Sequence, residues 1–91
     1  MNKSAEYANG QRKYAQDGNF LTHYFENGEV KARGMMINGL MEGKWIFNKK
    51  EGYLWQVGNF LKGERQGNWT RYKADGSVAD KKEFKDDKQV K

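Results

Sequence analysis

The chain has 91 residues and a net charge of +5, from 17 basic and 12 acidic side chains, which suits one small domain. It has no cysteine, which excludes a disulfide framework, a cysteine-ligated metal and a thiol nucleophile. Leu, Ile, Val and Phe are scarce, but three tryptophans and five tyrosines supply apolar area in their place, so we expect a folded chain.

The N-terminal segment, residues 1–18, carries the turn signals Asn9-Gly10 and Asp17-Gly18. These signals predict a partial or capping repeat unit. The segment shows no apolar run of the kind found in a signal peptide, and no stretch of the sequence has the length of a membrane helix. We therefore expect a cytoplasmic location.

Residues 19–85 contain a pattern that returns every 24 residues, and this repeat is the strongest feature of the sequence. Glycines and tryptophans hold the spacing and are expected to define the structure of each unit. They are Gly28, Gly52 and Gly76; Gly34 and Gly58; Gly39 and Gly63; Gly43 and Gly67; and Trp45 and Trp69. Glycine this frequent is unfavourable inside helices, so each unit is predicted to be a pair of short strands.

Tight turns are predicted to join the two strands of each unit, at Asn27-Gly28, Glu51-Gly52 and Asp75-Gly76. Asn-Gly and Asp-Gly favour two-residue hairpin turns in which both central residues have positive φ. Asn38-Gly39 and Lys62-Gly63 are interpreted as the starts of longer return loops that end at Gly43 and Gly67. The predicted fold class is all-β: a single-layer antiparallel β-meander of tandem 24-residue hairpin repeats, with about six strands.

The turn positions also predict which residues face one another across the strands. A turn centred on Glu51-Gly52 places Trp45 opposite Gly58 and Phe47 opposite Gln56. The equivalent turns place Leu21 opposite Gly34 and Trp69 opposite Lys82. A large ring lying over a strand glycine gives that glycine a packing role. We therefore expect the ring of Trp45 to cover Gly58.

The C-terminal end departs from the pattern, because Asp86-Asp87 stands where glycine is expected. Terminal units of a repeat array often differ because they cap it. Residues 86–91 are expected to form a solvated tail. The predicted organisation is thus a partial or capping unit over residues 1–18, a repeat domain over 19–85 and a tail over 86–91.

Residues 34–45, Gly-Met-Met-Ile-Asn-Gly-Leu-Met-Glu-Gly-Lys-Trp, resemble a MORN repeat, and residues 58–69 fit the same pattern. The 24-residue period and the added strand at residues 23–28 are similar to the bacterial YwqK-type antitoxin repeat proteins. The resemblance implies an elongated antiparallel sheet without shared catalytic residues. It also implies functions seen in the family, which include proposed antitoxins or immunity partners of secreted toxins, and eukaryotic relatives linked to membranes and scaffolding.

Side chains alternate across a strand, so the repeating apolar columns are expected to share one core face. These columns are Leu21, Trp45 and Trp69; Val30, Leu54 and Val78; and Met36, Phe60 and Phe84. The predicted register places a different row on the other face, consisting of Tyr24, Lys31, Asn48, Trp55, Tyr72 and Ala79, with Ile46, Val57 and Tyr53 near it.

The candidate partner-binding residues are the large aromatic ones that lie outside the core columns: Tyr24, Tyr53, Trp55 and Tyr72. Trp and Tyr are common anchors of protein interfaces. Two interpretations of this second face stay open. It binds a partner, or it is buried by the N-terminal segment, by the longer loops or by a second copy of the chain.

The sequence offers no catalytic, cofactor-binding or metal-binding candidates. His23 is the only histidine, and no spacing gives it a partner, so an ordinary strand residue is expected. Glu51 and Asp75 recur at the turn position and are interpreted as turn residues. Basic and acidic side chains are interleaved, which does not favour nucleic acid and makes an anionic membrane surface a weak alternative.

These observations lead to a hypothesis of a non-enzymatic protein-binding repeat module. The resemblance adds the idea of an antitoxin or immunity-type protein that binds and blocks a toxin, or of self-association. The alternative hypothesis is a structural or membrane-peripheral scaffold that binds anionic lipid.

Overall fold

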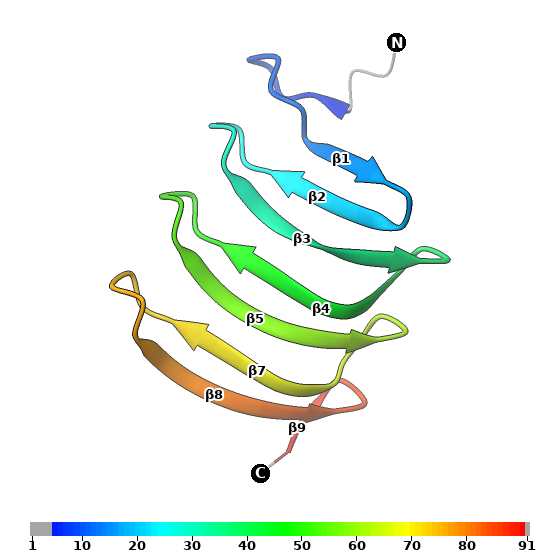
Figure 1. Cartoon of the computed structure of the whole chain (residues 1–91), viewed down its shortest axis with the longest axis vertical. Coiled ribbons are helices and arrows are strands. Elements are labelled where there is room, and N and C mark those ends of the chain that lie inside the picture. The colour runs from blue at the N-terminus through cyan, green and yellow to red at the C-terminus, as the bar shows by residue number, and fades with distance from the viewer. Residues whose placement is uncertain (1–4, 91) are drawn as a thin grey trace.

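The computed structural model describes residues 5–90, which form one open antiparallel sheet of nine strands. The strands are β1 (Tyr14–Asp17), β2 (Phe20–Tyr24), β3 (Val30–Ile37), β4 (Leu40–Asn48), β5 (Leu54–Leu61), β6 (Glu64–Arg65), β7 (Gly67–Tyr72), β8 (Val78–Lys85) and β9 (Lys88–Val90). The strands follow the chain order across the sheet, with β7 next to β5 (Figure 1). The short β6 pairs with β5 and lies outside this order. The predicted all-β antiparallel meander is confirmed, with nine strands rather than about six.

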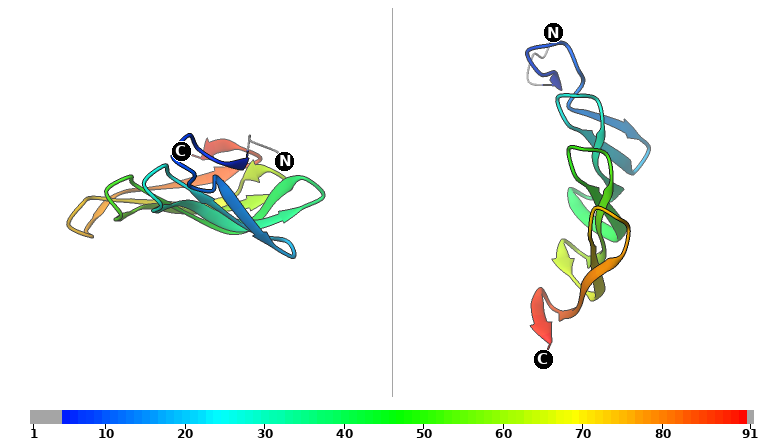
Figure 2. Two further views of the ribbon diagram at one scale, coloured as in Figure 1. Left: turned by 90° about the horizontal axis from the view of Figure 1, so that it is seen from above. Right: turned by 90° about the vertical axis from the view of Figure 1, so that its left-hand side faces the viewer.

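The sheet is a single twisted layer. Seen from the side, the strands form one thin band, and nothing in residues 5–90 makes a second layer against either face (Figure 2). The molecule measures 47 × 35 × 18 Å along its principal axes. Both faces of the sheet are therefore open over much of their area.

The turns at Asn27-Gly28, Glu51-Gly52 and Asp75-Gly76 occur where the sequence predicts them, but their type differs from the prediction. Phe25 N–H donates to the Glu29 carbonyl and Gly28 N–H donates to the Phe25 carbonyl, which leaves a three-residue loop. Only Gly28 has a positive φ there; Asn27 instead accepts the Glu29 N–H on its side-chain oxygen, at 2.9 Å. The backbone bonds are equivalent at all three turns, so the predicted two-residue turns are wrong at each of them. At Asn27 and at Asp75 the side-chain oxygen accepts the N–H two residues on, a local hydrogen bond that favours a type I turn.

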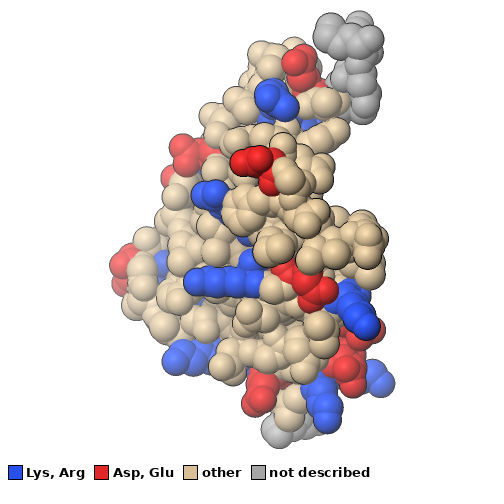
Figure 3. Space-filling view, turned by 45° about the vertical axis from the view of Figure 1, so that its right-hand side comes forward, with Lys and Arg blue, Asp and Glu red and all other residues tan. Residues whose placement is uncertain are grey.

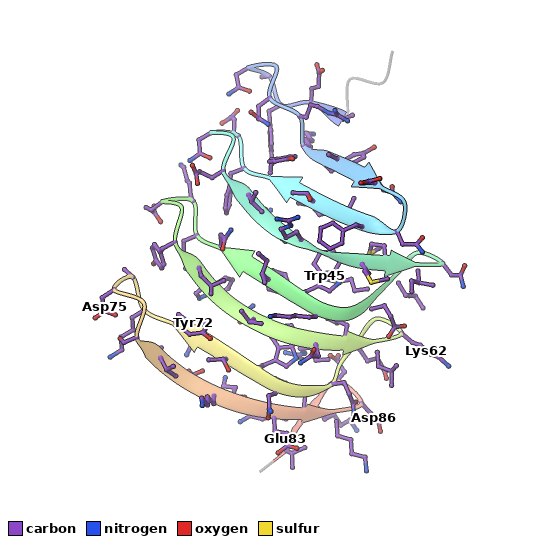
Figure 4. All side chains as sticks on the ribbon, in the orientation of Figure 1. Trp45, Lys62, Tyr72, Asp75, Glu83 and Asp86 are labelled. Carbon is purple, nitrogen blue, oxygen red and sulfur yellow. The ribbon has the colours of Figure 1, made fainter. Side chains whose placement is uncertain are left out.

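The two-residue turns, in which both residues have a positive φ, lie at the other ends of the strands. They are Asn38-Gly39, Lys62-Gly63 and Asp86-Asp87, and Lys62 and Asp86 are labelled at those ends in Figure 4, across from Asp75. Ile37 pairs directly with Leu40, and Leu61 pairs with Glu64. The predicted longer return loops are thus wrong: these connections are the tight hairpins.

Lys62 destabilises this turn, because its φ is 50° and residues with a Cβ rarely adopt a positive φ. Asn tolerates this conformation, so Lys62→Asn should raise the free energy of unfolding by about 0.5–1 kcal/mol. Urea denaturation measures the difference. Lys50→Asn is the matched control, because Lys50 is an exposed turn residue without a positive φ. An equal gain in both variants would contradict the backbone explanation.

The sequence predicted that Gly43 and Gly67 end return loops. The structure instead places both glycines at irregularities within the strand pairing. Gly43 has a φ of 73° inside β4, where the register with β3 shifts between Arg33 and Met35. Gly67 has a φ of 71° at the start of β7, directly after the short β6. Positive φ in a strand is typical of β-bulges, so both glycines bend their strands.

A second set of bulges lies next to the three-residue turns. Tyr24 pairs with Val30 while His23 pairs with Ala32, so Lys31 is an extra residue without a partner in β2. The same shift leaves Trp55 unpaired between β4 and β5, and Ala79 unpaired between β7 and β8. An extra residue changes which face the following side chains occupy.

Both ends of the described chain add to the sheet. In the N-terminal segment, β1 pairs with β2, and Glu6 forms an isolated bridge with Arg12. Tyr7 Oη donates to the Tyr24 carbonyl at 2.8 Å. At the other end, β9 pairs with β8 after the Asp86-Asp87 turn, within the segment expected as a tail. Its side chains are exposed, and its backbone continues the meander.

The predicted strand register of the core is confirmed, but the tryptophan ring that covers each glycine is not the predicted one. Trp45 pairs with Gly58 and Leu21 pairs with Gly34, as expected. The Trp45 ring, however, covers Gly34 of β3, and the Trp69 ring covers Gly58. Each tryptophan therefore reaches back over the glycine of the preceding strand, and the predicted placement of Trp45 over Gly58 is wrong.

Candidate binding surfaces on the two faces of the sheet

One face of the sheet carries a continuous layer of rings, which we call the aromatic face. It consists of Trp45, Phe47, Phe60, Trp69 and Phe84. Phe47 lies between the two tryptophans, with ring centroids 6.2 Å from Trp45 and 5.9 Å from Trp69. Phe60 meets Trp69 edge to face at 5.1 Å. Such offset and edge-on pairs stabilise a single layer beyond the area that they bury.

Each tryptophan ring lies flat on the sheet because its indole N–H is hydrogen-bonded to the backbone and its ring fits over a strand glycine. Trp45 Nε1 donates to the Met35 carbonyl at 3.0 Å, and Trp69 Nε1 donates to the Asn59 carbonyl at 3.0 Å. The missing side chain of Gly34 or Gly58 makes room for the ring. Trp45 is only 1% exposed as a result, although no second layer covers it.

The expected core face is correct for two of its three columns and wrong for the third. Val30, Leu54 and Val78 pair with Tyr24, Asn48 and Tyr72. Directly paired residues in antiparallel strands share a face. The bulges at Lys31, Trp55 and Ala79 thus move the Val30, Leu54 and Val78 column away from the tryptophans.

We call the other side of the sheet the tyrosine face. One row crosses it near the three-residue turns, consisting of Tyr24, Val30, Asn48, Leu54, Tyr72 and Val78. Asn48 Nδ2 donates to the Val30 carbonyl at 3.1 Å, which joins two hairpins of this row. Ile46 and Val57 pair in the next row. Leu54 and Val78 are 37% and 47% exposed, so the row presents apolar area to solvent.

The structure therefore separates the four predicted binding residues. Tyr24 and Tyr72 share the tyrosine face, as expected, and both are half-buried. Trp55 does not join them, because its bulge directs it toward Phe47 on the aromatic face. Tyr53 ends the three-residue turn, where its carbonyl accepts the Lys49 N–H at 2.9 Å. Sequence reasoning missed Val30, Leu54 and Val78 as surface residues because a bulge leaves no mark in the apolar spacing.

Three shallow grooves cross the aromatic face. One of about 310 Å³ is lined mainly by apolar side chains, including Leu21, Met36 and Trp45. Another, of about 280 Å³, lies over Trp69 and Phe84 beside the Arg71–Asp80 ion pair. The third, of about 320 Å³, lies between Phe25, Phe47 and Trp55. A volume of about 300 Å³ is at the lower end of the range for small-molecule pockets, so these grooves suit single side chains or small groups.

Charged residues are interleaved over the surface rather than gathered in one field. Figure 3 shows acidic and basic side chains mixed across the side in view. Among residues 5–90, the ion pairs are Arg65–Asp87, at 2.8 Å, and Arg71–Asp80. Hydrogen bonds from Arg65 hold the pKa of the exposed Asp87 below its usual value.

His23 lines the groove of about 310 Å³ together with Lys31. Partial burial lowers the pKa of His23 below its ordinary value of 6.5, and the positive charge of Lys31 lowers it further. The neutral ring is therefore favoured in the folded protein. Below pH 6.5 the unfolded chain takes up this proton more readily than the folded chain, so the free energy of unfolding falls there as pH falls.

Removing the charge of Lys31 should raise the pKa of His23. We expect a ring-proton NMR titration of the wild type to give a midpoint below 6.5, and Lys31→Met to move that midpoint upward. Lys82→Met is the control, since Lys82 lines a different groove. Equal midpoints for the wild type and Lys31→Met would contradict the electrostatic contribution.

Within residues 5–90, no group of three or more His, Cys, Asp or Glu side chains is placed to hold a metal ion. The same residues contain no helix with the length and hydropathy of a bilayer span. No protein-family model, no curated protein and no solved structure matches this sequence.

Proposed function

We propose that this chain is a non-enzymatic repeat module that binds a protein partner through its tyrosine face. The observation that carries the proposal is the row of Tyr24, Leu54, Tyr72 and Val78 on an open sheet face. Apolar side chains exposed together on one surface are typical of protein interaction sites. Tyrosine adds large contact area with a polar tip, which suits a surface that is wet in the free protein.

Hydrogen bonds that recur at a 24-residue step support the repeat part of this proposal. Gly63 N–H donates to the Met41 carbonyl at 2.9 Å, and Asp87 N–H donates to the Arg65 carbonyl at 3.0 Å. The tryptophan Nε1 bonds show the same step. A MORN-like array of hairpin units accounts for this recurrence, because each unit repeats one set of contacts with its neighbour.

The resemblance to bacterial antitoxin repeats suggests what the partner is. We propose a toxin that this chain blocks by covering part of its surface, in the manner of an immunity protein. A sheet face is suited to that task, because its backbone is already ordered in the free protein and less conformational entropy is lost on binding.

Charge-reversal variants of two adjacent lysines test whether the partner binds the tyrosine face. Lys81 pairs with Thr70 on the tyrosine face, whereas Lys82 pairs with Trp69 on the aromatic face, and both are exposed. The full chain is used as bait, a captured protein is purified, and its affinity for each variant is measured by calorimetry. We expect Lys81→Glu to weaken binding about tenfold or more and Lys82→Glu to leave it nearly unchanged.

Two outcomes would contradict the proposal. Loss of affinity with Lys82→Glu alone would assign the partner to the aromatic face. Sedimentation with vesicles rich in anionic lipid, with no protein partner that responds to Lys81→Glu, would favour the membrane-peripheral scaffold instead. If a partner is found, its activity with and without this chain tests the blocking role directly.

A further inference from the structure

The groove between Phe25, Phe47 and Trp55, which we call the Trp55 groove, combines apolar and basic side chains in one place. Its remaining lining residues are Lys31, Asn48, Lys49, Lys50 and Glu51. Lys49 Nζ lies 4.2 Å from the centroid of the Trp55 ring, and Lys31 Nζ lies 5.8 Å from that of Phe25. Both ammonium groups are held over aromatic rings at the edge of the groove.

The groove exists because of two bulges in successive hairpins. Lys31 is the extra residue of β3, and Trp55 is the extra residue of β5. Regular pairing would direct both side chains to the tyrosine face, as the sequence predicts. The bulges instead direct them to the aromatic face, where they line one groove together with Phe47. A bulge that redirects a side chain in this way is a common feature of binding sites.

Among the described residues, the side chains that line the Trp55 groove carry a net positive charge. Lys31, Lys49 and Lys50 line it, against the single carboxylate of Glu51. The Glu29 carboxylate lies nearby, beside Gly52 at the turn. In the described part of the chain, both ion pairs involve arginines at other places, so none involves these lysines.

We propose that the Trp55 groove binds an acidic segment of a protein, which places one aromatic or branched aliphatic side chain against Trp55 and Phe47. The volume of about 320 Å³ accommodates one large side chain. The lysines around it complement carboxylates on neighbouring residues of the bound segment. This site lies on the face opposite the proposed partner surface, so the two proposals can fail separately.

A protein segment fits the groove better than a nucleic acid strand does. Stacked bases and phosphates also use aromatic and basic side chains, but a strand needs a basic track that continues beyond one ring. On the aromatic face, the nearest arginines toward the C-terminus, Arg65 and Arg71, already pair with Asp87 and Asp80. Beyond the Trp55 groove, Lys82 is the other lysine that lines a groove on this face, so the described basic side chains do not form a continuous track.

The test uses the full chain and a short fluorescent peptide rich in Asp and Glu with a central Phe, followed by anisotropy. One control peptide replaces Phe with Ser, and another replaces the acids with Lys. We expect the acidic Phe peptide to bind, and Trp55→Ala to weaken it about tenfold or more. Replacing Lys31 and Lys49 with Ser should also weaken it, whereas Lys82→Ser, outside the groove, should not.

Tryptophan emission gives a second readout that does not depend on stability. Trp45 and Trp69 are buried, whereas Trp55 is half-buried, so peptide binding should change the emission of Trp55. Trp55→Phe should retain binding by anisotropy and lose most of this change. Equal affinity for the Phe and Ser peptides, or an unchanged affinity in Trp55→Ala, would overturn the proposal. Tighter binding of a single-stranded oligonucleotide or of anionic vesicles would overturn it as well.

Discussion

Trp45→Ala should lower the free energy of unfolding by roughly 3–5 kcal/mol, which is a large share of the stability of a chain of this size. Trp45 is 1% exposed and contacts both Phe47 and Phe60 through its ring. The substitution removes that apolar contact and leaves the Met35 carbonyl without the indole N–H that it accepts. Urea denaturation followed by far-ultraviolet circular dichroism measures the loss.

Trp55→Ala is the matched control for this experiment. It deletes the same side chain from a half-buried bulge position, where the ring lies beside Lys49 and lines an open groove. We expect it to cost about 1 kcal/mol or less. Similar losses in the two variants would show that the aromatic face does not stabilise the sheet as described.

Gly58→Ala should destabilise the protein by roughly 1–3 kcal/mol, although it adds a single methyl group. A Cβ at this position would overlap the ring of Trp69, which cannot move away because its Nε1 is bonded to Asn59 and its edge meets Phe60. The backbone φ of Gly58 is not positive, so the cost comes from packing rather than from strain. Urea denaturation again gives the value.

A double-mutant cycle identifies which ring is responsible. The penalty of Gly58→Ala should shrink in a Trp69→Leu background and persist in Trp45→Leu, even though Trp45 is the residue paired with Gly58. The Hα resonances of Gly58 provide an independent check, because the Trp69 ring should shift them upfield and Trp69→Leu should remove the shift. Rescue by Trp45→Leu instead would contradict the observed placement.

The strand register could be predicted from the sequence because two kinds of pattern agreed. The 24-residue spacing gave the turn positions, and large residues then fell opposite small ones, as Trp45 does with Gly58 and Leu21 with Gly34. The turn types could not be predicted in the same way. Asn-Gly fits a two-residue turn through its backbone and a three-residue turn through its side chain, and the hydrogen bond from Glu29 to Asn27 decides between them.

The candidate surfaces were predictable only in part, for a related reason. Assigning side chains to faces by alternation assumes that the strand contains no bulge. The assignment holds for Phe60 and Phe84, which lie beyond the bulges. It fails at Val30, Leu54 and Trp55, which lie beside them. The last strand, β9, was missed because Asp86-Asp87 lacks glycine, yet both residues adopt the positive φ that a tight turn requires.

The order of strands in this sheet has a consequence for how the protein unfolds. The strands follow the chain order across the sheet, except that β7 rather than the short β6 continues it after β5, and within residues 5–90 no strand pairing links β1 to β9. Unfolding can then begin at β1 or β9 without disturbing the packing around Trp45 and Trp69. Amide hydrogen exchange should accordingly be slowest in β4 and β5 and faster toward each terminus, as expected for an array held by neighbour contacts rather than by one central core.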